Sequence, residues 1–381
     1  MNKNYDVTVV GAGPAGATLA CELAAKGIGV LLLEKEGLPR YKCCAGGVTI
    51  KATRLLNFDI SEVTEDVVRE ISFTFNLGSP YLGQHGQPLM HTVMRGVFDH
   101  FLVKRAKQLG AVLTDGQRVT RVRVVGDRVE ISTADSVYAS RLVVGADGTH
   151  SIVARELGMQ RSIEYLIGIE SEIVVPEKEQ AKWKSRAQVD LGCVAGGYAW
   201  AFPKRNRLSV GVGSHVSKPR DLQAQHGKFL NSLNLGSCAV TSSCSHLIPT
   251  CTKGKLIWQD KALLLGDAAG LADPLTGEGI YNAIRSAQLA APVIEGFLAG
   301  RKAQLEDYQR IIESEILSEL RIARRLWRLF VRFPHLAFRM LSQNEEVWKA
   351  LSDLMLGEIS YADLKGGAGG LGGILKHLLR A

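Results

Sequence analysis

Apolar positions along the chain follow strand-like and helix-like patterns in turn. Residues 5–10 (YDVTVV) and 28–34 (IGVLLLE) are apolar runs typical of buried strands, and the segment between them carries apolar residues at helical spacing. Another buried strand is predicted at 261–267, and a helix follows from about 278 to 298. This order predicts an α/β fold that opens with a strand–helix–strand unit.

The middle of the chain has a different pattern. Residues 98–109 predict a helix, and the β-rich runs after it contain a hairpin signal at Gly126-Asp127. The stretch from about 161 to 255 lacks long helical patterns and predicts an antiparallel sheet. Residues 305–356 are predicted to be mostly helical.

Composition narrows the classes of partner. The 381 residues include 46 Lys and Arg against 38 Asp and Glu, a net charge of +8. Such an excess fits an anionic cofactor, a phosphorylated substrate or a membrane face, and it fits equally a protein that binds no polyanion. No dense basic run with interleaved aromatic residues occurs, so no nucleic-acid partner is expected. No apolar run reaches the roughly 18 residues that span a bilayer.

The seven cysteines form an odd set without metal-ligand spacing. The adjacent pair Cys43-Cys44 suits neither metal chelation nor an ordinary disulfide, and no signal-peptide pattern precedes residue 5. We therefore expect free thiols, no metal and a cytoplasmic location, with or without peripheral contact to the membrane.

A nucleotide-binding motif lies between the first strand and its helix. Residues 11–16 (GAGPAG) fit G-x-G-x-x-G, in which the glycines allow a tight turn, close approach of a pyrophosphate, and helix packing. Glu34 ends the next strand, where a carboxylate accepts hydrogen bonds from ribose hydroxyls and repels a 2′-phosphate, which favours FAD or NAD over NADP. The predicted contacts are Gly11, Gly13, Pro14, Ala15, Gly16, Glu34 and Lys35.

Two later segments each carry an apolar strand that ends in Gly and Asp. They are 142–151 (LVVGADGTHS) and 266–280 (GDAAGLADPLTGEGI). Ligands bind open α/β sheets at this end of the strands. Asp147 and Asp267 are either helix caps or cofactor ligands, and the two roles are compatible.

The three segments, in this order, resemble the FAD fold of the aromatic hydroxylase superfamily. The resemblance implies that the first segment holds the ADP half, the second lies near the pyrophosphate, and the third holds the ribityl chain and isoalloxazine. Arg95 resembles the superfamily's arginine that opens a helix and contacts the cofactor. The cofactor contacts implied in this way are Arg95, Asp147, Gly148, Gly266, Asp267, Pro274, Gly277, Gly279 and Ile280.

Two further segments resemble the geranylgeranyl reductase family, whose flavoenzymes saturate isoprenoid double bonds. Residues 198–203 match its Y-x-W-x-F-P, and Gly211-Val212-Gly213 follows after seven residues. Residues 39–47 (PRYKCCAGG) match its Cys-Gly-Gly-like loop, although Ala45 and the extra Cys43 depart from the common form. The resemblance places Cys44 nearest the flavin as a thiol that gates or assists protonation, with Tyr41 as a second donor or positioner; otherwise Cys44 is a small buried apolar residue.

Alternation along residues 198–203 projects three aromatic side chains from one face of a strand. They form either a wall along a polyprenyl chain or an ordinary sheet core. Lys204, Arg205 and Arg207 follow, as contacts for an anionic head group or as a solvated turn. The predicted substrate contacts are Tyr198, Trp200, Phe202, Pro203, Gly46 and Gly47.

The sequence leaves two alternatives each for the electron donor and for the role of residues 319–341. No second G-x-G-x-x-G follows a predicted strand, since the only other match lies in the low-complexity Gly-rich tail, so we expect a transiently docked NAD(P)H or a reduced ferredoxin-like protein as donor. Residues 319–341 carry six Arg and no acid after Glu319, with a kink expected at Pro334. This helix either rests on an anionic membrane as a peripheral contact or packs on the body with its Arg stems over apolar surface.

The resulting fold class is α/β, with a Rossmann-like FAD-binding domain of the aromatic hydroxylase type, an antiparallel-sheet substrate domain and a helical C-terminus. The expected function is FAD-dependent reduction of geranylgeranyl double bonds in a lipid, diphosphate, pigment or quinone precursor. The alternatives are a flavin monooxygenase or halogenase, and a non-catalytic electron-transfer protein. The predicted boundaries are 1–75, 95–155 and 256–300 for the FAD-binding domain, 76–94 and 156–255 for the substrate domain, and 301–381 for the helical region with a flexible Gly-rich tail at 366–373.

Overall fold

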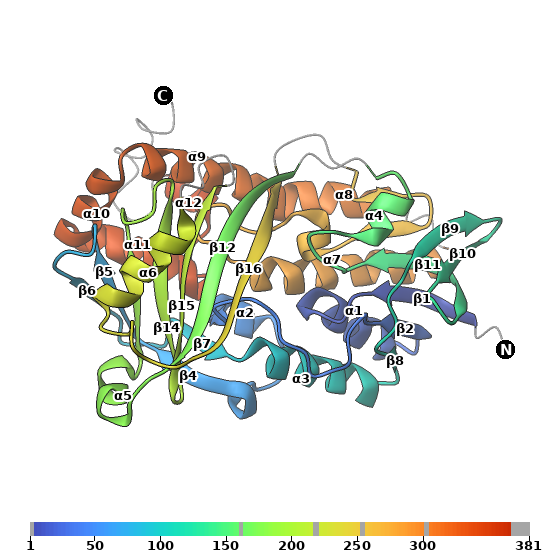
Figure 1. The fold of residues 1–381 in the computed structure, drawn as a ribbon. Helices are drawn as coiled ribbons and strands as arrows, with labels where there is room; N and C mark the ends of the chain where they lie inside the picture. The colour runs from blue at the N-terminus through green and yellow to red at the C-terminus, as the bar shows by residue number, and fades with distance from the viewer. Residues whose placement is uncertain (1–3, 160–162, 216–220, 252–255, 301–304, 367–381) are drawn as a thin grey trace.

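A computed structural model describes residues 4–159, 163–215, 221–251, 256–300 and 305–366 (Figure 1). Two sheets lie along the long axis of the molecule, and the C-terminal helices run beside them. All but the first residue of the predicted Gly-rich tail lie outside the described residues, and so do residues 375–381 (LKHLLRA), whose sequence predicts a short helix.

The first sheet has eight strands with a parallel centre, in the order β17-β18-β11-β1-β2-β8, and β10 and β9 extend it from β11. Helix α1 contacts both α3 and α7. The β2 strand is buried along its whole length, as expected for a strand inside a covered parallel sheet. The predicted strands at 5–10, 28–34 and 261–267 are therefore confirmed. The bounds are β1 Asn4–Val10, α1 Pro14–Ala24, β2 Val30–Leu33, α3 Arg95–Gln108, β8 Val112–Thr114, β9 Arg121–Val125, β10 Arg128–Ser132, β11 Val137–Gly145, α4 Ile152–Glu156, β17 Trp258–Gln259, β18 Ala262–Leu264, η2 Gly266–Ala269 and α7 Ile280–Leu298.

The second sheet has seven strands in the order β16-β12-β15-β14-β13-β5-β6, and all its pairings are antiparallel except β13 with β5. Ala199 and Ala201 face a core that includes Phe229 of α6. The β5 strand belongs to this sheet, although its sequence falls within the predicted cofactor segment 1–75. The bounds are β5 Glu70–Thr74, β6 Tyr81–Gln84, β12 Ile163–Val174, α5 Glu177–Trp183, β13 Arg186–Asp190, β14 Gly197–Lys204, β15 Arg207–His215, α6 Leu222–Ser232 and β16 Val240–Cys251.

Smaller elements connect these sheets to the C-terminal helices. Three short strands form a third sheet in the order β3-β7-β4. The predicted kink at Pro334 is a full break: α9 ends at Arg332 and α10 begins at Pro334, because the residue before a proline is disfavoured in the helical conformation. The bounds are β3 Gly47–Thr49, α2 Ile50–Arg54, η1 Ser61–Val63, β4 Thr64–Val68, β7 Met90–Val93, α8 Glu306–Ile312, η3 Glu313–Leu317, α9 Ser318–Arg332, α10 Pro334–Gln343, α11 Glu345–Leu356 and α12 Tyr361–Gly366.

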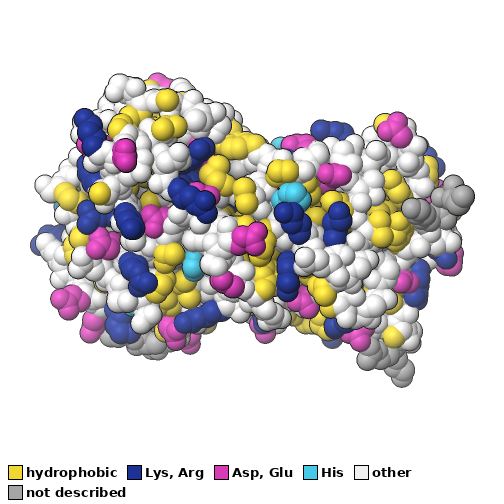
Figure 2. All heavy atoms as spheres, turned by 90° about the horizontal axis from the view of Figure 1, so that it is seen from below, with side chains coloured by type: hydrophobic (Ala, Val, Ile, Leu, Met, Phe, Trp, Pro, Cys, Tyr) yellow, Lys and Arg dark blue, Asp and Glu magenta, His cyan; other side chains and the backbone are white. Residues whose placement is uncertain are grey.

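The surface gives two further observations. Figure 2 shows basic and acidic side chains interspersed over the face seen from below. Among the described helices, none is both long and apolar enough to cross a bilayer.

Candidate active site

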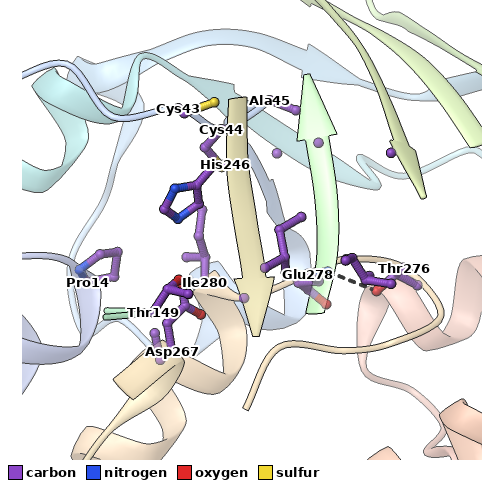
Figure 3. Close-up of a pocket in the computed structure, with 18 of the residues that line it drawn as sticks. Pro14, Cys43, Cys44, Ala45, Thr149, His246, Asp267, Thr276, Glu278 and Ile280 are labelled. Carbon is purple, nitrogen blue, oxygen red and sulfur yellow. Dashed lines mark hydrogen bonds between the residues drawn. The ribbon is translucent and has the colours of Figure 1, made fainter. Parts of the chain in front are cut away.

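A cavity of about 1190 Å³ lies between the two sheets. One end is lined by the three motif segments of the first sheet, and the other reaches helices α9–α11. Figure 3 shows Pro14, Thr149 and Asp267 close together at one side, with His246 and the Cys43-Cys44 loop above them. We call the first part the cofactor end and the second part the apolar arm.

The sheet register brings the three motif segments together at the cofactor end. Val10 pairs with Gly145, and Gly145 pairs with Leu264, so the strands β1, β11 and β18 end side by side. Backbone hydrogen bonds continue past the strands: Ala146 N donates to Val10 O at 2.8 Å, and Leu265 N donates to Gly145 O at 2.9 Å. Segments more than 250 residues apart thus form one edge, as open α/β sheets do at ligand sites.

The surroundings of the glycines of the first motif agree with their predicted roles. Gly11 has φ +100°, and a Cβ there would lie 2.4 Å from Ala146 O. A Cβ on Gly16 would lie 1.9 Å from Gly11 O, so this glycine lets α1 pack against the turn. Gly13 faces open space instead, with Arg40 as the nearest group at 4.0 Å. Of these three glycines, Gly13 is therefore the one with open space over its α-carbon for close approach of a ligand.

The groups at the cofactor end fit a dinucleotide. Gly13 and Gly279 are the N-cap residues of α1 and α7 and provide no side-chain cap, so the N–H groups in the first turns of these helices can bind phosphate. The buried Asp147 Oδ1 has no hydrogen-bond partner among the described residues. Glu34 is 4% exposed and accepts from Ala12 N at 3.0 Å, which holds its carboxylate at the end of β2. The residues present fit FAD.

Basic side chains surround Asp267 at the same end. Burial raises the pKa of Asp267, and the charges of Lys42 and Arg95 oppose this. Burial and the positive charges of Lys42 and Arg95 lower the pKa of His246 to about 4, so its ring is neutral near pH 7 and accepts a hydrogen bond from Lys42 Nζ at 2.7 Å. Arg95 opens α3 and binds Asp99 Oδ1 at 2.9 Å; burial lowers its pKa, but the Asp99 charge outweighs this and raises it.

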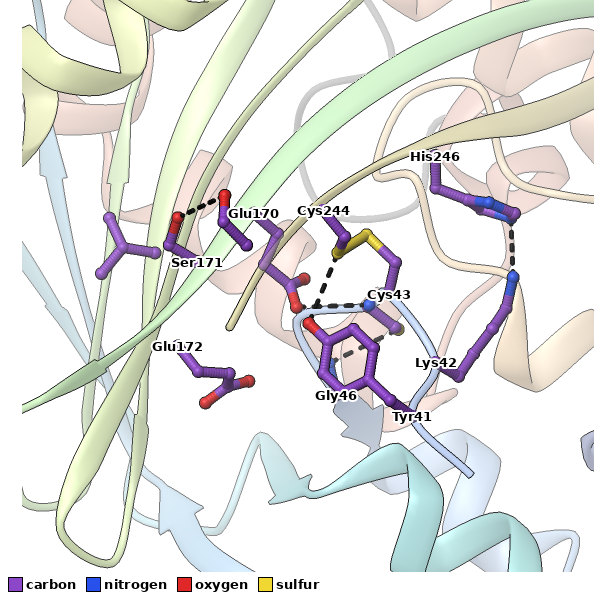
Figure 4. Close-up of a disulfide and its surroundings, with 12 residues drawn as sticks. Tyr41, Lys42, Cys43, Gly46, Glu170, Ser171, Glu172, Cys244 and His246 are labelled. Atoms are coloured by element: carbon purple, nitrogen blue, oxygen red, sulfur yellow. Dashed lines mark hydrogen bonds between the residues drawn. A yellow bond between two sulfur atoms is a disulfide. The ribbon is translucent and has the colours of Figure 1, made fainter. Parts of the chain in front are cut away.

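A disulfide joins Cys43 to Cys244 of β16 (Figure 4). The expectation that all seven cysteines are free is therefore wrong for these two. Spacing could not reveal the pair, because its members are 201 residues apart. Cys44 stays free, lines the cavity, and its Sγ accepts from Gly46 N at 3.4 Å.

The residues beside the disulfide also contact the second sheet. Tyr41 Oη lies 3.4 Å from Cys244 Sγ, and Cys44 N donates to Glu170 Oε1 of β12 at 3.3 Å. Glu170 and Cys244 are direct register partners, so the loop spans the edge strand β16 and its neighbour. The loop of residues 40–46 therefore closes over the boundary between the two sheets. Tyr41 remains partly exposed, at 46%.

Tyr198, Trp200 and Phe202 lie on the cavity face of β14, as the alternation predicts. Tyr198 Oη donates to Thr276 O at 2.6 Å and so connects this wall to the loop before Gly277. Gly47 lies under Phe202, since a Cβ there would be 2.9 Å from Cε2 of the ring. The three rings thus line the cavity together, from the loop before Gly277 to Gly47.

The apolar arm continues to the C-terminal helices. Its lining is aliphatic and aromatic, and the half-exposed Phe333 and Leu336 mark the place where it meets the surface. Residues 319–341 thus pack on the body with one face, while Arg325, Arg328 and Arg332 are exposed on the other. Further residues of the arm are Ile71, Phe73, Val189, Leu191, Leu326, Phe330 and Met340.

The structure places most predicted site residues on the cavity. Those lining it are Gly11, Gly13, Pro14, Ala15, Glu34, Lys35, Tyr41, Cys44, Gly47, Arg95, Asp147, Gly148, Tyr198, Trp200, Phe202, Asp267, Gly277, Gly279 and Ile280. Five others do not line it: Gly16, Gly46, Pro203, Gly266 and Pro274. Gly46 turns the chain with φ +77°, and Pro203 faces away from the cavity, where its carbonyl accepts from Thr92.

Two outcomes were not expected from the sequence. Lys204 is buried in an ion pair with Glu172 and is therefore no head-group contact. Glu170 lines the cavity, although no motif singled it out. The signal was available in the alternation Leu166, Gly168, Glu170, which puts an acid on the same strand face as two cavity residues.

Known proteins resemble the chain in sequence and fold. The family described as FAD binding domain matches residues 4–188. A digeranylgeranylglycerophospholipid reductase of Methanopyrus kandleri is 32% identical, over 76% of this chain and 80% of that protein. A geranylgeranyl bacteriochlorophyll reductase-like protein from Thermoplasma acidophilum superposes with a TM-score of 0.80 at 23% identity, covering 92% of this chain and 96% of the other. A flavin-dependent brominase shares the fold with a TM-score of 0.76 at 21% identity, covering 93% and 94%. The FAD-binding α/β fold is thereby confirmed, and the chain belongs to the geranylgeranyl reductase family of FAD-dependent oxidoreductases.

Proposed function

We propose that the protein reduces isoprenoid double bonds in a long-chain substrate carried as a lipid, a diphosphate, or a pigment or quinone precursor. One observation carries the proposal: a cavity that holds the FAD motifs at one end continues past three aromatic rings into an apolar arm. Each methylene removed from water contributes about 0.8 kcal/mol, so a twenty-carbon chain can bind in such an arm mainly by burial.

The chemistry assigns separate tasks to the chain's own residues. An isolated trisubstituted alkene is electron-rich, so hydride addition at one carbon requires a proton at the other. FAD, when bound and reduced, supplies the hydride. The aromatic wall formed by Tyr198, Trp200 and Phe202 orients the prenyl chain of the substrate and excludes water. Cys44 and Tyr41, on the loop that covers the site, are proposed to gate or assist the protonation; a Cys44→Ala variant with undiminished turnover would reject that role for the thiol.

An anaerobic reaction tests the function directly. The FAD-loaded protein is reduced with dithionite and mixed with geranylgeranyl diphosphate or a geranylgeranyl phospholipid. We expect a mass gain of two hydrogens for each saturated bond, measured by mass spectrometry. Unchanged substrates in the presence of fully reduced protein would contradict the proposal.

Two other functions remain as alternative outcomes of this experiment. A monooxygenase or halogenase on the same fold needs oxygen, so turnover without oxygen excludes both. A halogenase also usually carries W-x-W-x-I-P. In this chain Tyr198 stands in place of the first Trp, and Phe202 stands in place of the Ile. A non-catalytic electron-transfer protein would leave the alkenes unchanged while it exchanges electrons with other carriers.

The donor and the place of reaction are finer parts of the proposal. NAD(P)H or a reduced ferredoxin-like protein supplies the electrons, and residues 319–341 form a peripheral contact with the membrane. The exposed Arg325, Arg328 and Arg332 beside the half-exposed Phe333 and Leu336 support this contact. A lipid chain would then pass from the membrane directly into the apolar arm.

A further inference from the structure

Glu170 is a buried acid on the substrate side of the cavity. It follows Leu166 and Gly168 on one face of β12, and all three line the cavity. The residue is 2% exposed, and Figure 4 shows its carboxyl group directed toward the loop that carries Tyr41 and Cys43. Its carboxyl oxygen lies within 4.8 Å of both disulfide sulfur atoms. The acid therefore lies where the covering loop meets the second sheet.

The other acids that line the cavity have partners or positions that exclude them as proton donors to the substrate. Glu34 pairs with Arg40, Asp147 accepts from the first amides of α4, and Glu278 binds Lys51 Nζ at 2.7 Å. Asp267 and Glu36 lie at the cofactor end. Within the described ranges, Glu170 forms no ion pair. It is thus the acid left to act beside the aromatic wall.

We propose that Glu170 is the general acid that protonates the substrate double bond. This inference rests on the proposed function. The Glu170 O–H bond breaks and its proton forms a new C–H bond at one alkene carbon, while the other carbon receives the hydride that the reduction already requires. The two electrons of the hydride and the alkene π pair end in the two new C–H bonds. Glu170 is left as a carboxylate and regains a proton from water before the next turnover.

The surroundings of Glu170 keep a proton available near neutral pH. Burial raises its pKa to about 7, and the charge of Glu172 on the same strand adds to this. Lys204 of β14, the Cys44 amide and the Ser209 hydroxyl oppose the rise. The remaining titratable groups that face it are Tyr41 and Cys44 on the loop. A general acid is most effective when its pKa lies near the working pH.

Single-turnover kinetics compare Glu170→Gln with the wild type and with Glu62→Gln, an exposed acid outside the site. Each FAD-loaded protein is reduced anaerobically and mixed with geranylgeranyl substrate, and reoxidation of the flavin is followed at several pH values. We expect the wild type and Glu62→Gln to slow as pH rises above about 7, and Glu170→Gln to be slower by ~100-fold or more without that dependence. Binding of FAD and of the substrate should be unchanged.

A measurement without turnover accompanies the kinetics. The infrared difference between wild type and Glu170→Gln should contain a protonated-carboxyl band that disappears with a midpoint near pH 7. The inference is overturned if this band is absent, or if Glu170→Gln reoxidises its flavin at the wild-type rate with the pH dependence intact.

If Glu170→Gln does not fold, the pH dependence of the wild type tests the proposal instead. A wild-type rate of flavin reoxidation that stays constant between about pH 6 and 9 would exclude Glu170 as the proton donor. Wild-type protein that never saturates the alkene would overturn the proposed function, and the assignment of Glu170 with it. A working wild type with a fast Glu170→Gln variant would overturn the assignment alone.

Discussion

The indole ring of Trp200 lies against Gly211, its cross-strand partner on β15. A Cβ on Gly211 would be 2.3 Å from Cζ2 of the ring, and one on Gly213 would be 3.3 Å from Cζ3. Strands β14 and β15 are joined by a two-residue turn, which sets Tyr198 opposite Gly213 and Trp200 opposite Gly211. The spacing between Y-x-W-x-F-P and G-x-G therefore gives the tryptophan room to lie flat on the sheet.

Adding a methyl group at these glycines should displace the ring into the cavity. We expect Gly211→Ala to lower kcat/KM for a prenyl substrate by about tenfold or more, and Gly213→Ala to have a smaller effect, because misplacement of positioning groups is costly. FAD binding should be unaffected in both. The control is Gly227→Ala in α6, where a Cβ would meet no atom of the described residues within 4 Å beyond its own helix backbone and chain neighbours. Equal effects at Gly211 and Gly227 would contradict this account of the motif.

The disulfide between Cys43 and Cys244 ties the covering loop to β16. Because it closes a long stretch of chain, removing it with the double variant Cys43→Ser/Cys244→Ser should lower the free energy of unfolding by roughly 2–5 kcal/mol. Reduction of the wild type with a thiol should produce the same loss, measured by urea unfolding with and without reductant. Cys238→Ser, at a free cysteine, is the control and should retain the response to reductant. A wild type indifferent to reductant would show that the pair is not joined in solution.

The sequence predicted the fold where its signals are local. The G-x-G-x-x-G segment needs a strand before it and a helix after it, and both could be recognised from apolar spacing. The face of β14 that carries Trp200 followed from alternation alone. These parts depend on neighbours within about ten residues, which a periodic pattern records.

Long-range relationships could not be obtained in this way. The pairing of Cys43 with Cys244 and the parallel pairing of β5 with β13 depend on register between distant strands. The basic run 204–207 predicts a solvated turn or a head-group contact for Lys204, whereas an ion pair with Glu172 of β12 holds this lysine in the interior. Alternation along β12 places Glu170 on one face of the strand, but its contact with the loop of Cys44 depends on the fold.

Glu34 combines a structural and a predicted binding role at the end of β2. It accepts from Ala12 N and lies 3.4 Å from Arg40 Nη2, so its removal leaves a buried amide and a cation less well paired. We expect Glu34→Ala to weaken FAD binding by about tenfold or more, since the ribose hydroxyls would lose a charged hydrogen-bond acceptor worth about 1.5–3 kcal/mol. Equilibrium titration of the apoprotein with FAD, followed by flavin fluorescence, measures the effect. Glu62→Gln should bind FAD as the wild type does, and a fully retained affinity in Glu34→Ala would exclude the ribose role.

The exposed row Arg325, Arg328 and Arg332 provides a test of membrane contact. Each basic residue near an anionic surface contributes about 1 kcal/mol, so replacing all three by Gln should weaken binding to phosphatidylserine vesicles by roughly 100-fold. Co-sedimentation measures this, and added salt should weaken wild-type binding in the same direction. A variant with Lys104, Arg121 and Arg123 replaced loses the same charge elsewhere on the exposed surface and should still sediment. If both triple variants lost the same vesicle affinity, the effect would be due to net charge and not to a membrane contact at Arg325, Arg328 and Arg332.

The raised pKa of Glu170 also makes a prediction about stability that does not depend on turnover. In the folded protein the pKa is about 7, whereas the ordinary value is 4.5. Above about pH 4.5 the unfolded chain releases this proton while the folded chain keeps it, so the stabilising contribution is complete below pH 4.5 and is lost as pH rises through about 7. Glu170→Gln does not titrate. The wild type should therefore lose about 3 kcal/mol of stability relative to Glu170→Gln as the pH rises from about 4.5 to about 7. Above about pH 7 the difference in free energy of unfolding between the two proteins should stay constant. Urea unfolding measures the difference, with Glu62→Gln as a control that should show no such gain. A difference independent of pH would mean that Glu170 is ionised in the folded protein and cannot hold the proton assigned to it.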